Sequence, residues 1–189
     1  MIQFEFDHMV DLHQHWLRDP RFGARADFTN KKIDNIDGSN KDLSKAIFDN
    51  TRIFFSDFSN TKFDNTSFYK ARLDNITLHK TSFKEANMLG TEITNTDIDN
   101  ADFWNTTGDG VHIISLQLGG HNVCYTDSIV QVNCKQFPIG TLWTMSDSEI
   151  LSTVTGHSES ELFELSKWWG AWKYQIRAIL TLYPAKSTI

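Results

Sequence analysis

Histidine and cysteine are the side chains of this sequence that could bind a metal ion or act as nucleophiles. Three histidines lie close together near the N-terminus, at His8, His13 and His15. The two cysteines, Cys124 and Cys134, lie far from them and lack the paired spacing of a zinc site. No cysteine or carboxylate cluster completes a metal site, which favours a solvated or capping role for the histidines. We expect two buried, reduced thiols, with a cross-strand disulfide as the open alternative.

The remaining polar residues show no catalytic signature. The sequence has no glycine-rich phosphate loop and no serine or cysteine in a recognisable nucleophile motif. A net charge of −6 disfavours direct binding to a nucleic-acid backbone. There is also no signal peptide, lipidation motif or long apolar run. We therefore expect a cytoplasmic protein that is not an enzyme, needs no cofactor or metal, and binds neither nucleic acid nor membrane.

A five-residue period organises the chain from Ala26 to Asn105. Nearly every fifth position carries a large apolar residue, and Gly38 is the single interruption. These centres are Phe28, Ile33, Leu43, Phe48, Ile53, Phe58, Phe63, Phe68, Leu73, Leu78, Phe83, Met88, Ile93, Ile98 and Phe103. Neither an α-helix nor a simple strand produces this spacing, which indicates a solenoid of stacked units. A small residue usually stands two positions before each centre, and asparagine, a turn residue, often stands two positions after it.

Units such as Ala-Asp-Phe-Thr-Asn at 26–30 and Ala-Asp-Phe-Trp-Asn at 101–105 resemble pentapeptide-repeat proteins. The resemblance implies a mainly β fold, a right-handed quadrilateral β-helix with four units per coil. About four coils would form a rod roughly 19 Å long. The expected domains are an N-terminal helical cap at 1–25, the solenoid at 26–107, and a C-terminal module of β-meander and helices at 108–189.

The two flanks predict the elements that close the solenoid. Apolar residues between Phe4 and Leu17 suit one face of a short helix that ends at Asp19-Pro20 and plugs the open end. After a turn-rich break, strand-like runs at 111–118, 122–126 and 129–134 predict an antiparallel meander. Two capping-box patterns then predict helices at 147–154 and 159–182. Both flanks resemble those of phage and prophage pentapeptide-repeat proteins.

If residues twenty apart stack in columns, the surface of the solenoid can be described face by face. A basic column, Lys32, Arg52 and Arg72, is flanked by Asp34 and Asp74, which indicates local salt bridges. The candidate acidic binding face comprises Asp37, Asp57, Asp97 and Asp99. The alternative is that aspartate before a centre is simply the residue that the repeat pattern prefers.

Two sets of apolar residues are candidate interfaces. Ile47, Tyr69 and Leu89 line one outward face, which is covered either by the C-terminal segment folding back or by a protein partner. The candidate C-terminal packing or dimer surface comprises Trp168, Trp169 and Trp172. The broad apolar stripe of their helix must pack on the meander, on the solenoid or on a second copy in a homodimer.

The leading functional hypothesis is a phage or prophage accessory protein that binds and blocks a host protein in the host cytoplasm. Pentapeptide-repeat proteins that protect or inhibit DNA gyrase look like duplex DNA, so the resemblance implies partial DNA mimicry directed at a DNA-processing or defence enzyme. One alternative is a small-ligand module that binds a nucleotide through Tyr125, Trp143, Trp168 and Trp172. Another is a structural oligomerisation unit.

Overall fold

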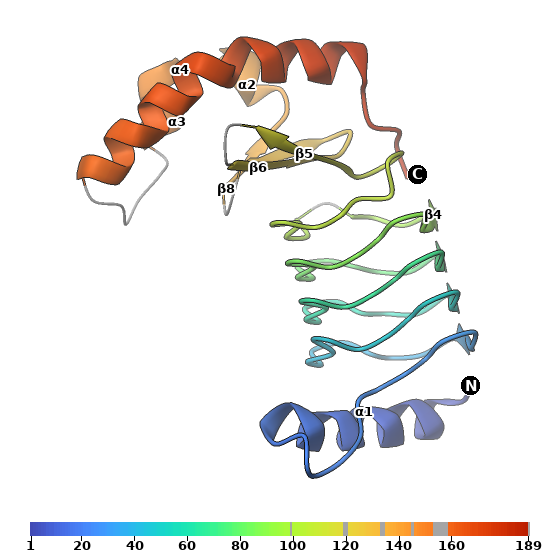
Figure 1. Ribbon diagram of the computed structural model, residues 1–189. Coiled ribbons are helices and arrows are strands. Elements are labelled where there is room, and N and C mark those ends of the chain that lie inside the picture. The colour runs from blue at the N-terminus through green and yellow to red at the C-terminus, as the bar shows by residue number, and fades with distance from the viewer. Residues whose placement is uncertain (99, 119–120, 133–134, 145, 153–158, 189) are drawn as a thin grey trace.

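The protein is a rod of stacked coils with a helix at one end and a sheet with helices at the other (Figure 1). A computed structural model describes residues 1–98, 100–118, 121–132, 135–144, 146–152 and 159–188. Helix α1 (Gln3–Arg18) ends before Asp19-Pro20, as predicted. Each coil takes twenty residues, so that residues twenty apart pair in register, for example Asp37 with Asp57.

Among the described residues of the solenoid, continuous strands of three residues form on one of the four faces. These are β1 (Lys32–Asp34), β2 (Arg52–Phe54), β3 (Arg72–Asp74) and β4 (Glu92–Thr94), which form a parallel sheet in chain order. Single parallel bridges join the coils on the other faces. At the position two residues after each centre the backbone is left-handed, with φ between 47° and 71°. Asparagine tolerates this conformation, which explains its recurrence there.

The centres of the five-residue units fill the interior of the rod, and all fifteen apolar centres are buried, as predicted. Phenylalanine rings stack from coil to coil, with centroids 4.5 Å apart between Phe28 and Phe48 and 5.0 Å apart between Phe48 and Phe68. The small residues two positions earlier are buried beside them. Where that residue is threonine, its hydroxyl usually donates to a centre carbonyl of the coil below, as Thr51 does to Phe28 at 2.7 Å, whereas Thr96 donates to Thr94 of its own coil. These bonds satisfy buried polar groups and fix the coil register.

Helix α1 closes the first coil through side chains that replace a neighbouring strand. The side chain of Gln3 donates to the carbonyl of Asp37 and accepts from its N–H, both at 2.9 Å. Gln14 donates to the carbonyl of Asp42 at 2.5 Å. His13 is fully buried and bonds the chain on both sides, at Ser44 and Ala26. The open backbone edge of the solenoid is thereby covered at this end.

Gly38, the break in the apolar series, makes room for an aromatic side chain. A Cβ atom at Gly38 would lie 2.3 Å from Cε1 of Phe58, so the ring of Phe58 occupies the space that a larger residue would need. Phe6 from α1 packs above it, with ring centroids 5.9 Å from Phe58 and 5.5 Å from Phe28. Gly38 therefore lies where the N-terminal helix packs on the first coil.

The C-terminal module is an antiparallel meander with three helices. The strands are β5 (Ile114–Leu118), β6 (His121–Tyr125), β7 (Ile129–Val132) and β8 (Lys135–Pro138), followed by α2 (Thr141–Thr144), α3 (Asp147–Ser152) and α4 (Glu159–Leu182). Strand β8 and helix α2 were not predicted. Proline is compatible with the end of an edge strand such as β8. In the part of the chain that the structure describes, no helix is long and apolar enough to span a membrane.

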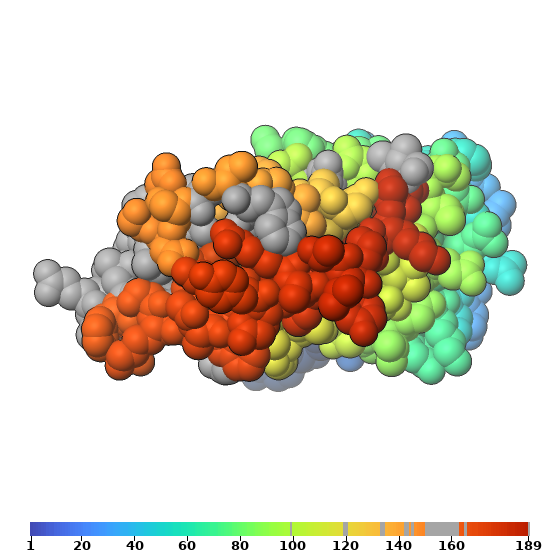
Figure 2. All heavy atoms as spheres, turned by 90° about the horizontal axis from the view of Figure 1, so that it is seen from above, coloured from blue at the N-terminus to red at the C-terminus, as the bar shows by residue number. Residues whose placement is uncertain are grey.

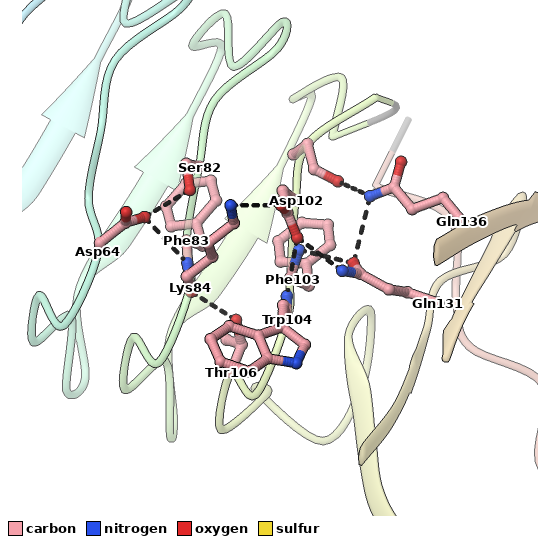
Figure 3. A network of polar contacts seen from close by, with 11 residues as sticks. Asp64, Ser82, Phe83, Lys84, Asp102, Phe103, Trp104, Thr106, Gln131 and Gln136 are labelled. Atoms are coloured by element: carbon pink, nitrogen blue, oxygen red, sulfur yellow. Dashed lines mark hydrogen bonds and ion pairs between the residues drawn. The ribbon is translucent and has the colours of Figure 1, made fainter. Parts of the chain in front are cut away.

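One face of the meander closes the last coil. Ser115, Cys124, Gln131 and Gln136 form a row across the sheet and face the solenoid. Gln131 accepts from the N–H of Phe103 at 2.9 Å and donates to Asp102 at 2.6 Å (Figure 3). Gln136 donates to the carbonyl of Ala101. Amide side chains thus cap the C-terminal edge as Gln3 and Gln14 cap the N-terminal one.

Candidate binding surfaces

The basic column is largely neutralised, as its flanking residues indicated. Lys32 bonds Asp34 at 2.8 Å, and Arg72 lies 4.0 Å from Asp74. Both pairs are partly exposed, so they contribute little to stability. Their effect is to cancel much of the positive charge on this face of the rod.

The described residues of the candidate acidic face are exposed. Asp37, Asp57, Thr77 and Asp97 form one column of parallel bridges, and the three aspartates are exposed. Asp99 lies outside the described residues. Considering only the described part of the chain, no ion pair within 4.0 Å involves Asp37 or Asp57.

Serine side chains hold the carboxylates of this column in place. Asp37 accepts from the N–H and hydroxyl of Ser39 at 3.0 and 2.7 Å, and Asp57 accepts from the same groups of Ser59 at 2.8 and 2.6 Å. The hydrogen bonds from Ser39 lower the pKa of Asp37 below its ordinary value. Asp37 is therefore ionised at neutral pH and points away from the rod in a fixed orientation.

The candidate apolar interface of Ile47, Tyr69 and Leu89 is not covered by the C-terminal segment, so the alternative in which this segment folds back over it was wrong. Tyr69 is 36% exposed and Leu89 52% exposed, while Ile47 is half-buried. The described C-terminal residues lie over the last coil instead (Figure 1). They do so because the open backbone edge there needs the hydrogen bonds that the meander supplies.

The tryptophans of α4 pack largely inside their own chain. Trp168 and Trp169 are buried against the second face of the meander, and Trp172 is half-buried. The indole N–H of Trp168 donates to the carbonyl of Leu118 at 2.6 Å, and that of Trp169 donates to Asp147 at 3.0 Å. Trp168 and Trp169 are thus unavailable to a second copy in this arrangement.

Two of the four aromatic residues of the ligand alternative, Tyr125 and Trp168, are buried. Tyr125 is buried, and its hydroxyl donates to the carbonyl of Tyr183 at 2.7 Å. Trp168 is likewise buried, and the side chain of Trp143 lies outside what the structure describes. Within the described residues, no group of three or more histidines, cysteines, aspartates or glutamates is arranged to bind a metal ion.

The cysteine and histidine expectations can be compared with the structure only in part. Cys124 is a buried free thiol whose pKa burial raises to about 12, so it remains protonated. Cys134 lies outside the described residues. His13 has the predicted capping role, whereas His8 and His15 are exposed.

Two features were not assigned to a candidate site from the sequence. Phe55 takes the left-handed corner conformation, with φ of 47°, and is 59% exposed, although its column neighbours Asn35 and Asn75 show what the corner prefers. Asp109 bonds the imidazole of His112 at 2.7 Å and accepts three backbone N–H groups. The apolar residue at a corner position was a usable signal for Phe55. The role of Asp109 in organising the turn depends on contacts that spacing alone does not reveal.

A family model described as pentapeptide repeats matches residues 66–105 in eight copies. Among solved structures, Rfr23 from the cyanobacterium Cyanothece 51142 is 22% identical, with 44% of this chain and 60% of that chain covered and a TM-score of 0.29. HetL from Nostoc sp. strain PCC 7120, a protein involved in heterocyst differentiation regulation, is 15% identical, with 45% and 46% covered and a TM-score of 0.30. No curated protein matches the sequence.

QnrB1, a plasmid-mediated fluoroquinolone resistance protein, is 21% identical, with 46% of this chain and 50% of that chain covered and a TM-score of 0.28. The chain thus spans 46% to 60% of the length of these three structures. The match to the repeat model agrees with the five-residue period and the four-sided coils described above. The central segment of the chain is therefore a right-handed quadrilateral β-helix, and residues 66–105 match the pentapeptide-repeat family.

Proposed function

We propose that this protein is a non-enzymatic accessory protein that binds and blocks another protein through the acidic face of its solenoid. The observation that carries the proposal is the column of exposed carboxylates at Asp37, Asp57 and Asp97. Their backbone is fixed by parallel pairing, and serine hydrogen bonds orient two of them. A charged surface that is ordered before binding loses little conformational freedom in the complex.

The chemistry of the face indicates a partner with a basic groove. Such grooves occur in enzymes that handle DNA, so the proposed partner is a DNA-processing or defence enzyme of a host cell, encountered in its cytoplasm. The flanks that resemble phage and prophage proteins support the same context. Complementary charge would accelerate association and make binding sensitive to salt.

The size of the rod limits how far the face can imitate DNA. Four coils span roughly 19 Å at the spacing of neighbouring strands. Duplex DNA carries one negative charge per about 1.7 Å of axis, which gives about 11 phosphates over the same length. The three described carboxylates reproduce only a small part of this charge. The mimicry we propose is therefore partial and directed at a short stretch of a DNA-binding groove.

The proposal can be tested with two variants of equal charge. One replaces Asp37, Asp57 and Asp97 with asparagine, which can still accept the serine hydrogen bonds of the first two. The control replaces Asp27, Glu85 and Glu92, exposed acids outside this column, with the matching amides. Each protein is immobilised and exposed to bacterial lysate at low and high salt, and retained proteins are identified by mass spectrometry.

We expect the wild-type and control proteins to retain one DNA-processing or defence enzyme at low salt and to release it at high salt. The variant of the acidic face should not retain it. Binding is then measured with the purified enzyme, together with its activity. Equal retention by both variants, or retention that is unaffected by salt, would contradict the proposal.

A further inference from the structure

The face of the solenoid that carries β1–β4 is interrupted at its second strand. In the first and third coils the outer side of the strand carries a base and an acid, and asparagine follows at the corner. These residues are Lys32, Asp34 and Asn35 in the first coil and Arg72, Asp74 and Asn75 in the third. The same positions of the second coil hold Arg52, Phe54 and Phe55. Two phenylalanines thus replace an aspartate and an asparagine in one coil.

This replacement removes contacts that support the neighbouring coils. Asp34 pairs with Lys32 at 2.8 Å and accepts from the side-chain amide of Asn35 at 2.9 Å. Phe54 can make neither contact, and Phe55 has the left-handed backbone, with φ of 47°, that asparagine tolerates better. Phe55 is also 59% exposed, so burial does not explain its presence. Departures from a local pattern that bring no gain in stability are expected at functional sites.

Arg52 lies between two other cations and has no acid two residues away. Its partners in the sheet are Lys32 and Arg72, each of which has its own aspartate. Neighbouring strands lie about 4.8 Å apart, and like charges at directly opposed positions are unfavourable. In the part of the chain that the structure describes, Arg52 takes part in no ion pair within 4.0 Å. A carboxylate from another molecule would restore the pairing of base and acid in this coil.

The three residues form one accessible surface. Arg52 and Phe54 share the outer side of β2, because Ile53 between them is buried. Phe54 is half-buried, with the ammonium group of Lys32 5.7 Å from its ring centroid, and Phe55 follows it at the corner. The described residues of the C-terminal module do not overhang the side of the rod on which β4 lies (Figure 1, Figure 2). We call Arg52, Phe54 and Phe55 the β2 patch.

We propose that the β2 patch binds a short segment of a partner protein that carries an acidic residue close to a large apolar one. The carboxylate pairs with Arg52, and the apolar side chain packs on Phe55 and the exposed part of Phe54. Arginine and aromatic residues often dominate the energy of protein interfaces. Three residues of extended chain span about 10 Å, so a segment of a few residues reaches from one end of the patch to the other.

The charges around the patch favour one carboxylate over a phosphate backbone. Asp34 and Asp74 lie on either side of Phe54 in the sheet, and Asp57 lies on the adjoining face. These acids repel a polyanion such as duplex DNA, which carries one charge per about 1.7 Å. A single carboxylate at Arg52 contacts cations on both sides. This inference goes beyond the proposed function and does not depend on it, because the acidic face is a different surface and attracts the opposite charge.

A library of short random peptides displayed on yeast is the probe for the patch. It is sorted for binding to the wild-type protein, and an enriched peptide is synthesised and measured by fluorescence anisotropy. We expect the enriched peptides to share an aspartate or glutamate near a large apolar residue and to bind with a dissociation constant on the order of micromolar. Arg52→Gln and Phe55→Asn should each weaken binding by about tenfold or more.

Two matched variants separate binding from folding. Lys62→Gln removes a charge at the same position of a unit on the opposite face of the rod, and Phe22→Asn removes another exposed aromatic side chain. Both should bind the peptide as the wild-type protein does. Phe55→Asn should bind weakly although its melting temperature rises, because corner strain is removed. The asparagine variant of the acidic face should bind at least as tightly as wild type, which separates this inference from the proposed function.

An exchange of charges tests the contact directly. Arg52→Glu should abolish binding of the selected peptide, and replacing the acid of that peptide with lysine should recover binding by about tenfold or more. Enriched peptides without a common acid, equal binding by Arg52→Gln or Phe55→Asn, or the absence of enriched peptides would overturn the proposal. Binding of a DNA or RNA oligonucleotide that depends on Arg52, or dimerisation that depends on it in sedimentation velocity, would also overturn it by identifying a different occupant.

Discussion

Replacing Phe6 with alanine should show how strongly the N-terminal helix stabilises the solenoid. Phe6 is fully buried and lies between the rings of Phe28 and Phe58, above the space left by Gly38. A change from phenylalanine to alanine in a core costs about 3–5 kcal/mol. In a chain of this length 1 kcal/mol corresponds to about 2–4 °C in melting temperature, so Phe6→Ala should lower it by about 6–20 °C.

Phe4→Ala is the matched control because Phe4 belongs to the same helix but is 78% exposed. We expect its effect on the free energy of unfolding to stay within about 0.5 kcal/mol. Thermal and urea unfolding, followed by circular dichroism, measure both variants.

Hydrogen exchange shows where stability is lost. In a solenoid each coil contacts only its neighbours, so loss of the cap should first loosen the adjacent coil. In Phe6→Ala, the amide of Asp37, which donates to Gln3 in the wild-type protein, should lose more protection than the amide of Phe103 at the far end. Equal destabilisation by Phe4→Ala, or equal loss of protection in the first and last coils, would refute this account of the cap.

Three further predictions concern the C-terminal cap, the corners, and His13 of the N-terminal cap. Gln131→Ala should lower the free energy of unfolding by about 1–3 kcal/mol, because it leaves the buried N–H of Phe103 without its acceptor. Gln117→Ala, at an exposed position, is the control and should change this free energy little. Urea unfolding measures both variants. Phe55→Asn should raise the melting temperature by about 2–4 °C by removing about 1 kcal/mol of left-handed strain, and the reciprocal Asn75→Phe should lower it. Burial lowers the pKa of His13 below its ordinary value of 6.5. The contribution of neutral His13 to the free energy of unfolding is therefore complete above about pH 6.5. This contribution is lost as the pH falls from there towards the lowered pKa of the folded state. Urea unfolding of wild type and His13→Gln between pH 7.5 and 5 should therefore converge on acidification; a constant difference would contradict this.

The solenoid could be predicted from the five-residue period, and its four-sided coil from the resemblance to pentapeptide-repeat proteins. Phe48 and Phe68 are spaced by a whole coil, which places them in one stack and places Asp37 and Asp57 in one outer column. The same logic identified the acidic face and the neutralised basic column before any contact was known. The pattern could not explain Gly38, because its reason is the position of the Phe58 ring of the next coil, which fills the space that a Cβ atom there would need.

The C-terminal module was less predictable because its elements are defined by long-range contacts. The row that closes the solenoid depends on the pairing of Gln131 with Gln136, and strand β8 exists only as an edge beside β7. The burial of Trp168 depends on the meander beneath it, so the apolar stripe alone left the meander, the solenoid and a second copy as possible packing partners. Side chains that act across domains were therefore the ones that sequence reasoning missed.

The solenoid is closed by two different elements, α1 at one end and the meander at the other, and this affects how the rod can change its length. Gln3 and Phe6 recognise only the first turn of the spiral, and Gln131 and Gln136 recognise only the last. The turns between them present the same pairing above and below. Duplication of twenty residues in this middle portion would lengthen the spiral by one coil and leave the contacts of both capping elements intact. Reach along a target surface can therefore evolve independently of the parts that terminate the molecule.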